Sequence, residues 1–201
     1  MPSIYDLKPR FQALLRPLAG FLAKSGATAN HVTVSALVLS FLAGSMIVLW
    51  PTARWPMYLI PVVLFVRMAL NAVDGMLARE HHMQSRLGAV LNELGDVISD
   101  AALYLPFAMV PGISAAAVVL VVVLGIVSEM AGVVAIQIDA ARRYDGPMGK
   151  SDRAFAFGFI GLLLGSGVSA GLWVNIILWV AIALLVMTIV NRSRQALKTA
   201  A

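Results

Sequence analysis

The sequence contains no cysteine among its 201 residues, and charged residues are scarce. The absence of cysteine excludes disulfide bonds, thiolate catalysis and zinc or iron–sulfur sites built on cysteine. Charged residues make up 12% of the chain and hydrophobic residues 60%, whereas soluble domains have about 25% charged and about 45–50% apolar residues. With a mean hydropathy of +0.88, this composition predicts a protein embedded in a membrane.

The sequence also lacks a long run of charges of one sign. Its formal net charge is +5, but the basic residues are distributed between apolar segments instead of forming one run. Such a distribution is typical of membrane topology. We therefore expect no nucleic-acid partner, and we expect membrane lipids to contact much of the chain.

The apolar segments predict the fold class. A transmembrane helix needs about 20 mostly apolar residues, and six segments separated by proline and glycine signals approach that length. We predict an all-α integral membrane protein with a single membrane domain over residues 1–201. The predicted spans are residues 33–50, 58–77, 87–110, 113–138, 154–170 and 172–190.

Residues 4–24 are too polar to form a span, but apolar side chains recur there at helical spacing with cations between them. Such a helix lies in the membrane interface, with its cations near anionic headgroups. We predict an amphipathic interfacial helix in front of the first span.

The positions of Lys and Arg predict the orientation. Basic residues precede the first span, follow the last, and occupy the connections between spans two and three and between spans four and five. The opposite connections contain only Arg54. Because cytoplasmic loops are enriched in Lys and Arg, we expect a bacterial-type inner-membrane protein with both termini in the cytoplasm.

The densest set of polar residues inside the spans runs from residue 71 to residue 100. On one helix, Asn71 and Asp74 share a face, and on the next helix Asn92, Asp96 and Asp100 are spaced four residues apart. Two antiparallel helices joined on the cytoplasmic side bring these stripes together. Ionisable groups in a span are functional candidates, and oxygen-rich clusters suit divalent cations. We therefore predict a cytoplasmic active site at this cluster.

The same segment resembles the signature of the CDP-alcohol phosphotransferases, D-x2-D-G-x2-A-R-x8-G-x3-D-x3-D. The matching positions are Asp74-Gly75, Ala78-Arg79, Gly88 and Asp96, with the family's spacing between Arg79 and Gly88. A second segment, Asn30 to Thr33 before the first span, is similar to the family's Pro-Asn-x-x-Thr motif, with Ala29 in place of proline.

The resemblance implies the roles of these residues. Asp96 is expected to be the general base. The CDP-alcohol is expected to bind at Asn30, Thr33, Asp74, Gly75, Ala78, Arg79 and Gly88. One or two divalent ions, Mg²⁺ or Mn²⁺, are expected at Asn71, Asp74, Asn92 and Asp96.

Two positions depart from the family pattern. The family has aspartate where this chain has Asn71 and Asn92, so we expect weaker metal binding and a single ion. Glu93 or Asp100 are alternatives for replacing the lost charge.

The implied reaction is transfer of a phosphatidyl or related phospho-alcohol group from a CDP-alcohol, foremost CDP-diacylglycerol, to a hydroxyl acceptor, with release of CMP. The acceptor stays open among glycerol phosphate, inositol phosphate, serine and another phospholipid. Lys150 and Arg153 are equally consistent with binding an anionic acceptor and with anchoring the loop at the headgroups. For Arg67 and Glu129, a structural buried ion pair is favoured over a substrate role.

Three hypotheses follow. The leading one is a phosphotransferase of phospholipid biosynthesis, which in this family can be a homodimer. The alternative is a catalytically weakened or silent member that binds nucleotide or a partner, supported by the two asparagines. A small transporter ranks last, because no inverted halves are visible in the sequence.

Overall fold

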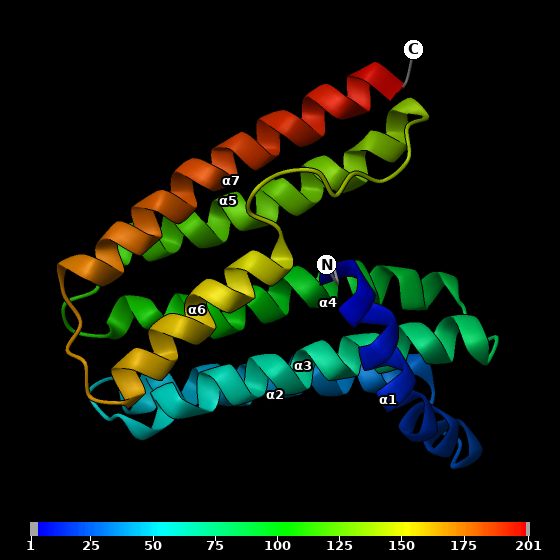
Figure 1. Ribbon diagram of the computed structural model, residues 1–201, viewed down its shortest axis with the longest axis horizontal. Helices are drawn as coiled ribbons and strands as arrows, with labels where there is room; N and C mark the ends of the chain where they lie inside the picture. Colours follow the sequence, from blue (N-terminus) through cyan, green and yellow to red (C-terminus); the bar gives the residue numbers. More distant parts are fainter. Residues whose placement is uncertain (1–3, 200–201) are drawn as a thin grey trace. The chain divides into compact units, whose positions relative to one another are not determined.

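A computed structural model describes the backbone of residues 4–199 and the side chains of residues 11–199. Within these residues the chain forms helices and no strand, which confirms the all-α prediction (Figure 1). The elements are α1 (Ile4–Lys24), α2 (Ala29–Leu49), α3 (Trp55–Glu80), α4 (Arg86–Tyr104), the 3-10 helix η1 (Leu105–Met109), α5 (Ala115–Val134), the 3-10 helix η2 (Ala135–Ile138), α6 (Lys150–Gly165) and α7 (Leu172–Thr199).

Four helices of the described chain are long and apolar enough to cross a membrane. They are α2, α3, α5 together with η2, and α7. The predicted spans 87–110 and 154–170 do not meet these criteria. The helix α4 carries four ionisable residues, and α6 has only 16 residues. Length and composition therefore support four of the six predicted spans.

Several helix ends differ from the predicted limits. The third predicted span was expected to reach residue 110, but α4 ends at Tyr104, and Pro106 lies in a 3-10 turn. Proline has no backbone N–H to continue the helical hydrogen bonds. At the C-terminus, α7 continues to Thr199, because the polar residues after the apolar segment are good helix formers.

Two helices end in the same hydrogen-bonded turn. After α1, the N–H of Ala27 donates to the carbonyl of Leu22, and after α6 the N–H of Val168 donates to the carbonyl of Leu163. In both turns the preceding residue is a glycine with positive φ, 82° at Gly26 and 97° at Gly167. Glycine adopts this conformation without steric cost, so the two glycines in the sequence explain why α1 and α6 end where they do.

The chain divides into two compact units. Unit 1 consists of Met1–Leu42 and Val62–Ser99, and unit 2 consists of Ala43–Pro61 and Asp100–Ala201. The helices α2, α3 and α4 contribute residues to both units. The expectation of one membrane domain stays a prediction.

The core of unit 1 joins α1 to α2 and α3. Its buried members are Ala19, Ala29, Val32, Val73, Met76 and Leu77. The other side of α1 remains exposed, with Leu14 at 76% and Phe21 at 67% of their full accessible surface. The helix therefore has two apolar sides, one packed against protein and one unpacked.

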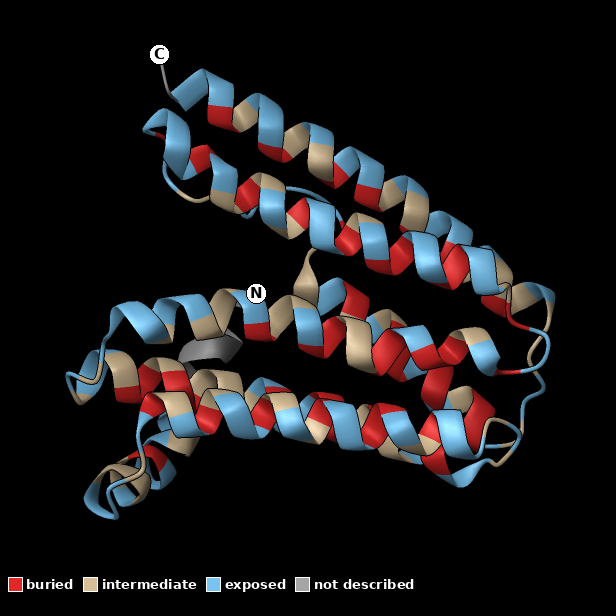
Figure 2. Cartoon of the chain, turned by 180° about the vertical axis from the view of Figure 1, so that it is seen from behind, coloured by how far each residue is buried: buried red, intermediate tan, exposed pale blue. Residues whose placement is uncertain are grey.

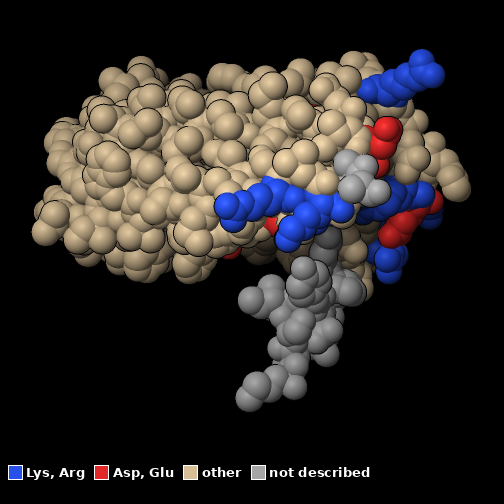
Figure 3. Space-filling model, turned by 90° about the horizontal axis from the view of Figure 1, so that it is seen from above, with Lys and Arg blue, Asp and Glu red and all other residues tan. Residues whose placement is uncertain are grey.

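In unit 2, α5 and α7 run side by side (Figure 1). The ring of Phe157 on α6 stacks on Tyr104 at 4.1 Å between centroids and meets Phe107 edge-on. Figure 2 shows that buried residues form stripes along the helices and that the opposite faces are exposed. Charged side chains gather in one area of the face drawn in Figure 3, and other residues form the rest of that face. An uncharged surface of this kind suits contact with lipid.

Candidate functional site

The first polar contact of unit 1 links α2 to α3. The hydroxyl of Thr33 donates a hydrogen bond to the Asp74 carboxylate, with an oxygen–oxygen distance of 2.8 Å. Asp74 is buried, whereas Thr33 is only half-buried. A charge-assisted bond of this length fixes the orientation of the carboxylate. The two residues lie more than forty positions apart in the sequence but are brought together, as their shared role in the predicted site requires.

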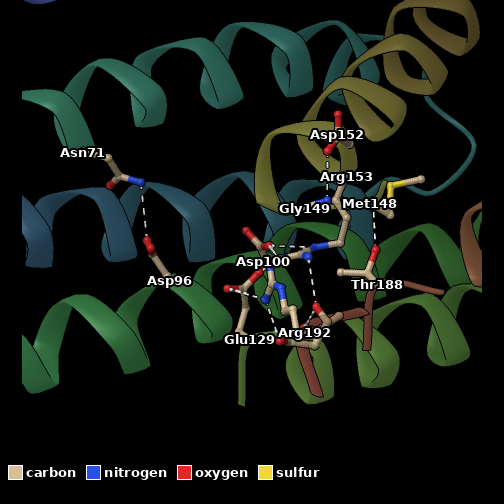
Figure 4. A network of polar contacts seen from close by, with 12 residues as sticks. Asn71, Asp96, Asp100, Glu129, Met148, Gly149, Asp152, Arg153, Thr188 and Arg192 are labelled. Atoms are coloured by element: carbon tan, nitrogen blue, oxygen red, sulfur yellow. Dashed lines mark hydrogen bonds and ion pairs between the residues drawn. The ribbon is translucent and has the colours of Figure 1, made fainter. Parts of the chain in front are cut away.

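The second contact links α3 to α4. The Asn71 amide donates to Asp96 over 3.4 Å (Figure 4), and the guanidinium of Arg67 donates to the backbone carbonyl of Asp96 at 3.0 Å. The Arg67 guanidinium also lies 3.9 Å from the Asp96 carboxylate. Arg67 is 3% exposed, whereas the Asp96 side chain is 27% exposed. Asp96 is therefore positioned by two side chains of α3 while its carboxylate stays accessible.

Glycine makes room for an arginine on α3. A Cβ atom at Gly75 would come within 3.1–3.5 Å of the guanidinium of Arg79. The Arg79 side chain therefore folds back over the preceding turn of its own helix, where a residue larger than glycine would press on it. Arg79 is exposed, so its guanidinium can reach an anionic ligand.

A second glycine lets α2 and α4 approach. A Cβ atom at Gly88 would lie 2.8 Å from the side-chain oxygen of Asn30 and 3.0 Å from the hydroxyl of Ser85. The Ser85 hydroxyl accepts from the N–H of Gly88 and caps the start of α4. The predicted nucleotide residues Asn30 and Gly88 are thus direct neighbours.

Other predicted site residues behave differently. Ala78 packs at the edge of the unit 1 core, which is a structural contact. Asn92 is half-buried on α4, one turn before Asp96. Asp100 forms an ion pair with Arg153 in unit 2, so its charge is already balanced there.

The oxygen ligands of unit 1 fit a divalent ion only in part. Among the residues described, no group of three or more His, Cys, Asp or Glu side chains is arranged to hold a metal. The available donors are the carboxylates of Asp74 and Asp96 and the amide oxygens of Asn71 and Asn92. Mg²⁺ is commonly held by one or two carboxylates together with substrate phosphates and water. The donor set therefore fits one ion shared with a phosphorylated substrate.

A second polar cluster lies in unit 2 (Figure 4). Arg153 on α6 donates to the Asp100 carboxylate of α4 at 2.9 Å and to the Glu129 carboxylate of α5 at 3.2 Å. It is 3% exposed. A buried arginine needs such partners, because an uncompensated charge in this position is strongly destabilising.

Glu129 is the centre of this cluster. Its second carboxylate oxygen lies 3.2 Å from Arg192 on α7 and 3.7 Å from Arg142. Two glycines on the same face of α5 provide space: a Cβ at Gly125 would meet Arg153 at 3.3 Å, and one at Gly132 would meet the backbone oxygen of Arg143 at 2.5 Å and Arg192 at 3.4 Å. The surface of α5 thus leaves room for the Arg153 side chain and for the backbone of Arg143 beside Arg192.

These contacts show which partners balance the charged residues inside the predicted spans. A structural buried ion pair was expected for Arg67 and Glu129. Both residues form ion pairs, but with other partners: Arg67 with Asp96, and Glu129 with three arginines. Arg192 was expected to lie in the basic cytoplasmic tail, but it is buried. The signal that identifies it is the helical spacing of the buried residues of α7, which include Leu178, Ala181, Leu185, Thr188, Arg192 and Ala196.

An ion pair between two residues close in sequence stabilises the loop before α6. Arg143 donates to Asp145 at 2.8 and 3.0 Å, and this hydrogen bond lowers the pKa of the Asp145 carboxyl. At the start of α6, the Asp152 carboxylate accepts from the N–H of Gly149. Lys150, which with Arg153 was a candidate for binding the acceptor, comes directly after Gly149 and is half-buried.

Comparisons with known proteins show which family the chain resembles. The model of the CDP-alcohol phosphatidyltransferase family matches residues 27–187. The inner membrane protein YnbA of Escherichia coli is 49% identical over 197 residues, covering 97% of this chain and 96% of that protein.

Solved structures show the same fold. Phosphatidylinositol phosphate synthase PgsA1 of Mycobacterium tuberculosis, in complex with manganese and citrate, superposes with a TM-score of 0.76 at 20% identity, covering 91% of this chain and 88% of that chain. The same enzyme with CDP-DAG bound gives a TM-score of 0.74 at 21% identity, covering 92% of both chains.

Proposed function

The chain belongs to the CDP-alcohol phosphatidyltransferase family, and from this premise we propose that it transfers a phosphatidyl or related group from a CDP-alcohol to a hydroxyl acceptor. It is a helical membrane protein of a family of phospholipid-synthesising transferases. The observation that carries the proposal is that unit 1 joins Thr33 to Asp74 and Asn71 to Asp96. CDP-diacylglycerol is the proposed donor, because the related fold of PgsA1 binds it.

The nucleotide half of the proposed site comprises Asn30, Thr33, Asp74, Gly75, Ala78, Arg79 and Gly88. Arg79 suits the diphosphate, since a guanidinium binds phosphate oxygens in a bidentate manner. Asn30 and Thr33 bring α2 to the same place, and Gly75 and Gly88 leave space for the side chains of Arg79 and Asn30. The proposal for each residue rests on its signature position and on the contacts described above.

Asp96 is proposed to accept the proton of the attacking hydroxyl. The acceptor oxygen forms a bond to the β-phosphorus, the bond from that phosphorus to the bridging oxygen of CMP breaks, and CMP leaves with the electron pair. A divalent ion, when bound by Asp74, Asp96 and the amides of Asn71 and Asn92, supplies positive charge to the phosphates. Arg67 and Asn71 hold Asp96 in place for this step.

The acceptor and the membrane orientation complete the proposal. Lys150 and Arg153 are proposed to border the acceptor. Both termini and the site are proposed to lie in the cytoplasm, with α4 and α6 crossing the membrane as the third and fifth of six spans. Arg54 and Gly167 adjoin each other in unit 2, as expected for two loops on the outer side. The exposed apolar side of α1, with Leu14 and Phe21, supports the interfacial helix.

The decisive experiment measures CMP. Purified protein in lipid vesicles, supplied with labelled CDP-diacylglycerol, Mg²⁺ or Mn²⁺ and a panel of hydroxyl acceptors, is expected to release CMP and form a new lipid. Binding of the CDP-alcohol is measured in parallel. Binding without CMP release for any acceptor supports the alternative of a silent member, and absence of both contradicts the proposal.

Replacing Gly88 with Ala is expected to weaken CDP-alcohol binding by about tenfold or more, because small displacements of positioning groups are costly. The added Cβ would lie 2.8 Å from the side-chain oxygen of Asn30 and would force that side chain to move. Titration of the CDP-alcohol measures the change. Gly20→Ala is the matched control, since nothing lies within 4 Å of its added Cβ; an equal effect in both variants would show that the Asn30 contact is not involved.

Asn71→Asp and Asn92→Asp are each expected to raise the affinity for Mn²⁺ by roughly tenfold, because the number of ligand charges tunes metal affinity. At Asn71 the new carboxylate faces Asp96, and a bound cation relieves their repulsion. Free Mn²⁺ measured by electron paramagnetic resonance gives the affinity without reference to activity. Asn191→Asp on α7 adds the same charge outside this set; if all three titrations coincide, Asn71 and Asn92 are not ligands.

A further inference from the structure

Three arginines in unit 2 direct their N–H groups at one carboxylate. Glu129 lies within 3.2 Å of Arg153 and of Arg192, and within 3.7 Å of Arg142. Two of these arginines are almost completely buried, Arg153 at 3% and Arg192 at 2% exposure. Proteins commonly bind a phosphate group where several guanidinium groups converge on one point. Here the point is occupied by a side chain of the protein.

Arg153 and Arg192 donate further hydrogen bonds to other groups of the protein. Arg153 gives its remaining donors to Asp100 and to the hydroxyl of Ser128. Arg192 donates to the carbonyls of Ser128 and Asp145. Arg153 and Arg192 are therefore hydrogen-bonded to the protein, and Glu129 and Asp100 offset two of the three positive charges of the cluster.

We infer that Glu129 is a specificity-determining residue that excludes phosphorylated acceptors, so that the acceptor is a hydroxyl compound without a phosphate group. The inference rests on the proposed function, in which Arg153 borders the acceptor. A phosphate entering the cluster would have to replace Glu129 at the arginines and would face two carboxylates of its own sign. Like charges at low dielectric repel strongly, so this exchange is unfavourable.

The architecture of α5 supports a dedicated role for Glu129. Gly125, one helical turn before Glu129, leaves room for the Arg153 side chain. Gly132, one turn after it, leaves room for the backbone of Arg143 and lies next to the Arg192 guanidinium. The cluster also connects α4, α5, α6 and α7. A purely structural role predicts a loss of stability when Glu129 is changed, but it predicts no change in the choice between two acceptors. The ratio of two rates therefore separates the two roles.

The first test compares paired acceptors. CMP release from CDP-diacylglycerol is measured with glycerol against glycerol 3-phosphate and with inositol against inositol 1-phosphate. Wild-type protein is expected to prefer the unphosphorylated member of a pair by about tenfold or more, and Glu129→Gln to shift the ratio about tenfold toward the phosphorylated member. Asp139→Asn removes the same charge from an exposed position whose backbone conformation, with φ 60°, asparagine accepts readily. It is expected to leave the ratio unchanged.

The second test needs no acceptor. Inorganic phosphate at millimolar concentration is expected to raise the melting temperature of Glu129→Gln but not that of wild-type protein or Asp139→Asn, because a ligand stabilises only the protein that binds it. Phosphate stabilisation of the wild type equal to that of the variant overturns the inference, as does a wild-type preference for the phosphorylated acceptor. If Glu129→Gln does not fold, a rise in the melting temperature of the wild type with phosphate, or its preference for the phosphorylated acceptor, overturns the inference. Absence of CMP with every acceptor instead overturns the proposed function, while the phosphate titration still reports on Glu129.

Discussion

Replacing Asp96 with Asn is expected to lower the rate of CMP release by about 10²–10⁴-fold, the usual contribution of a general base. The Asp96 carboxylate is 27% exposed and is oriented by Asn71 and Arg67. The substituted amide keeps the shape and an oxygen atom but cannot accept the proton of the attacking hydroxyl. The CDP-alcohol affinity is expected to change by no more than a few-fold, because the nucleotide contacts belong to other residues.

The measurement separates proton transfer from metal binding. CMP release is recorded at saturating substrate over a range of Mn²⁺ concentrations, and Mn²⁺ binding is titrated separately. If raising Mn²⁺ restores the rate of Asp96→Asn, Asp96 acts mainly as a ligand. The exposed Asp139→Asn is the control and is expected to retain the wild-type rate; an Asp96 variant as active as this control contradicts the proposed base.

Replacing Arg153 with Met is expected to reduce the free energy of unfolding by about 3–5 kcal/mol, as found when one partner of a buried ion pair is removed. The substitution removes the cation that lies 2.9 Å from Asp100 and 3.2 Å from Glu129. Methionine has a similar length and fills much of the volume, so the loss is mainly electrostatic. The addition of Asp100→Asn is expected to recover part of this loss. Unfolding by heat or denaturant in mild detergent measures these differences.

Arg143→Met is the matched control at the same pH. The Arg143 side chain is 19% exposed and that of its partner Asp145 is 37% exposed. The pair is therefore more open to solvent than the Arg153 cluster, and we expect its contribution to be closer to that of surface ion pairs, about 0–1 kcal/mol. The lowered pKa of Asp145, caused by the Arg143 hydrogen bond, means that this contribution is present above the ordinary carboxyl value of 3.8 and is lost as the pH falls through the lowered one. Both variants are therefore compared at neutral pH. Equal destabilisation by the two substitutions would contradict a special role for the buried cluster.

Much of the fold follows from local sequence signals. Long apolar segments identify four helices capable of crossing a membrane, and the N-terminal helix covers the predicted residues 4–24. The hydropathy signal is weaker for the predicted spans that contain α4 and α6. Charged residues lower the hydropathy of α4, and α6 is short for a transmembrane helix. The end of α7 was missed for the opposite reason: a helix continues beyond its apolar part when its polar residues favour helix.

The proposed site of unit 1 was also accessible from sequence. The spacing from Asp74 to Asp96 indicates both the family and two helices that face each other, and the structure joins Asn71 to Asp96. Thr33 and Asp74 were assigned to one site only through the family resemblance, and the hydrogen bond between them was not predicted. The contact of Arg67 with Asp96 was not predicted, although the spacing of four residues between Arg67 and Asn71 places them on one helical face.

The sequence alone determines what kind of protein this is, because hydropathy and motif spacing are properties of short segments. They can be read without knowing which other segments pack against them. It does not determine how the charges inside the helices are balanced. Arg192 belongs by sequence to a basic tail and Arg153 to a basic loop, yet both are buried against Glu129. Those contacts depend on which faces of α5, α6 and α7 pack together, and long-range packing leaves no local pattern around any one of these residues. Only the tertiary structure therefore shows that arginines suited to binding phosphate are already occupied by the protein's own carboxylates.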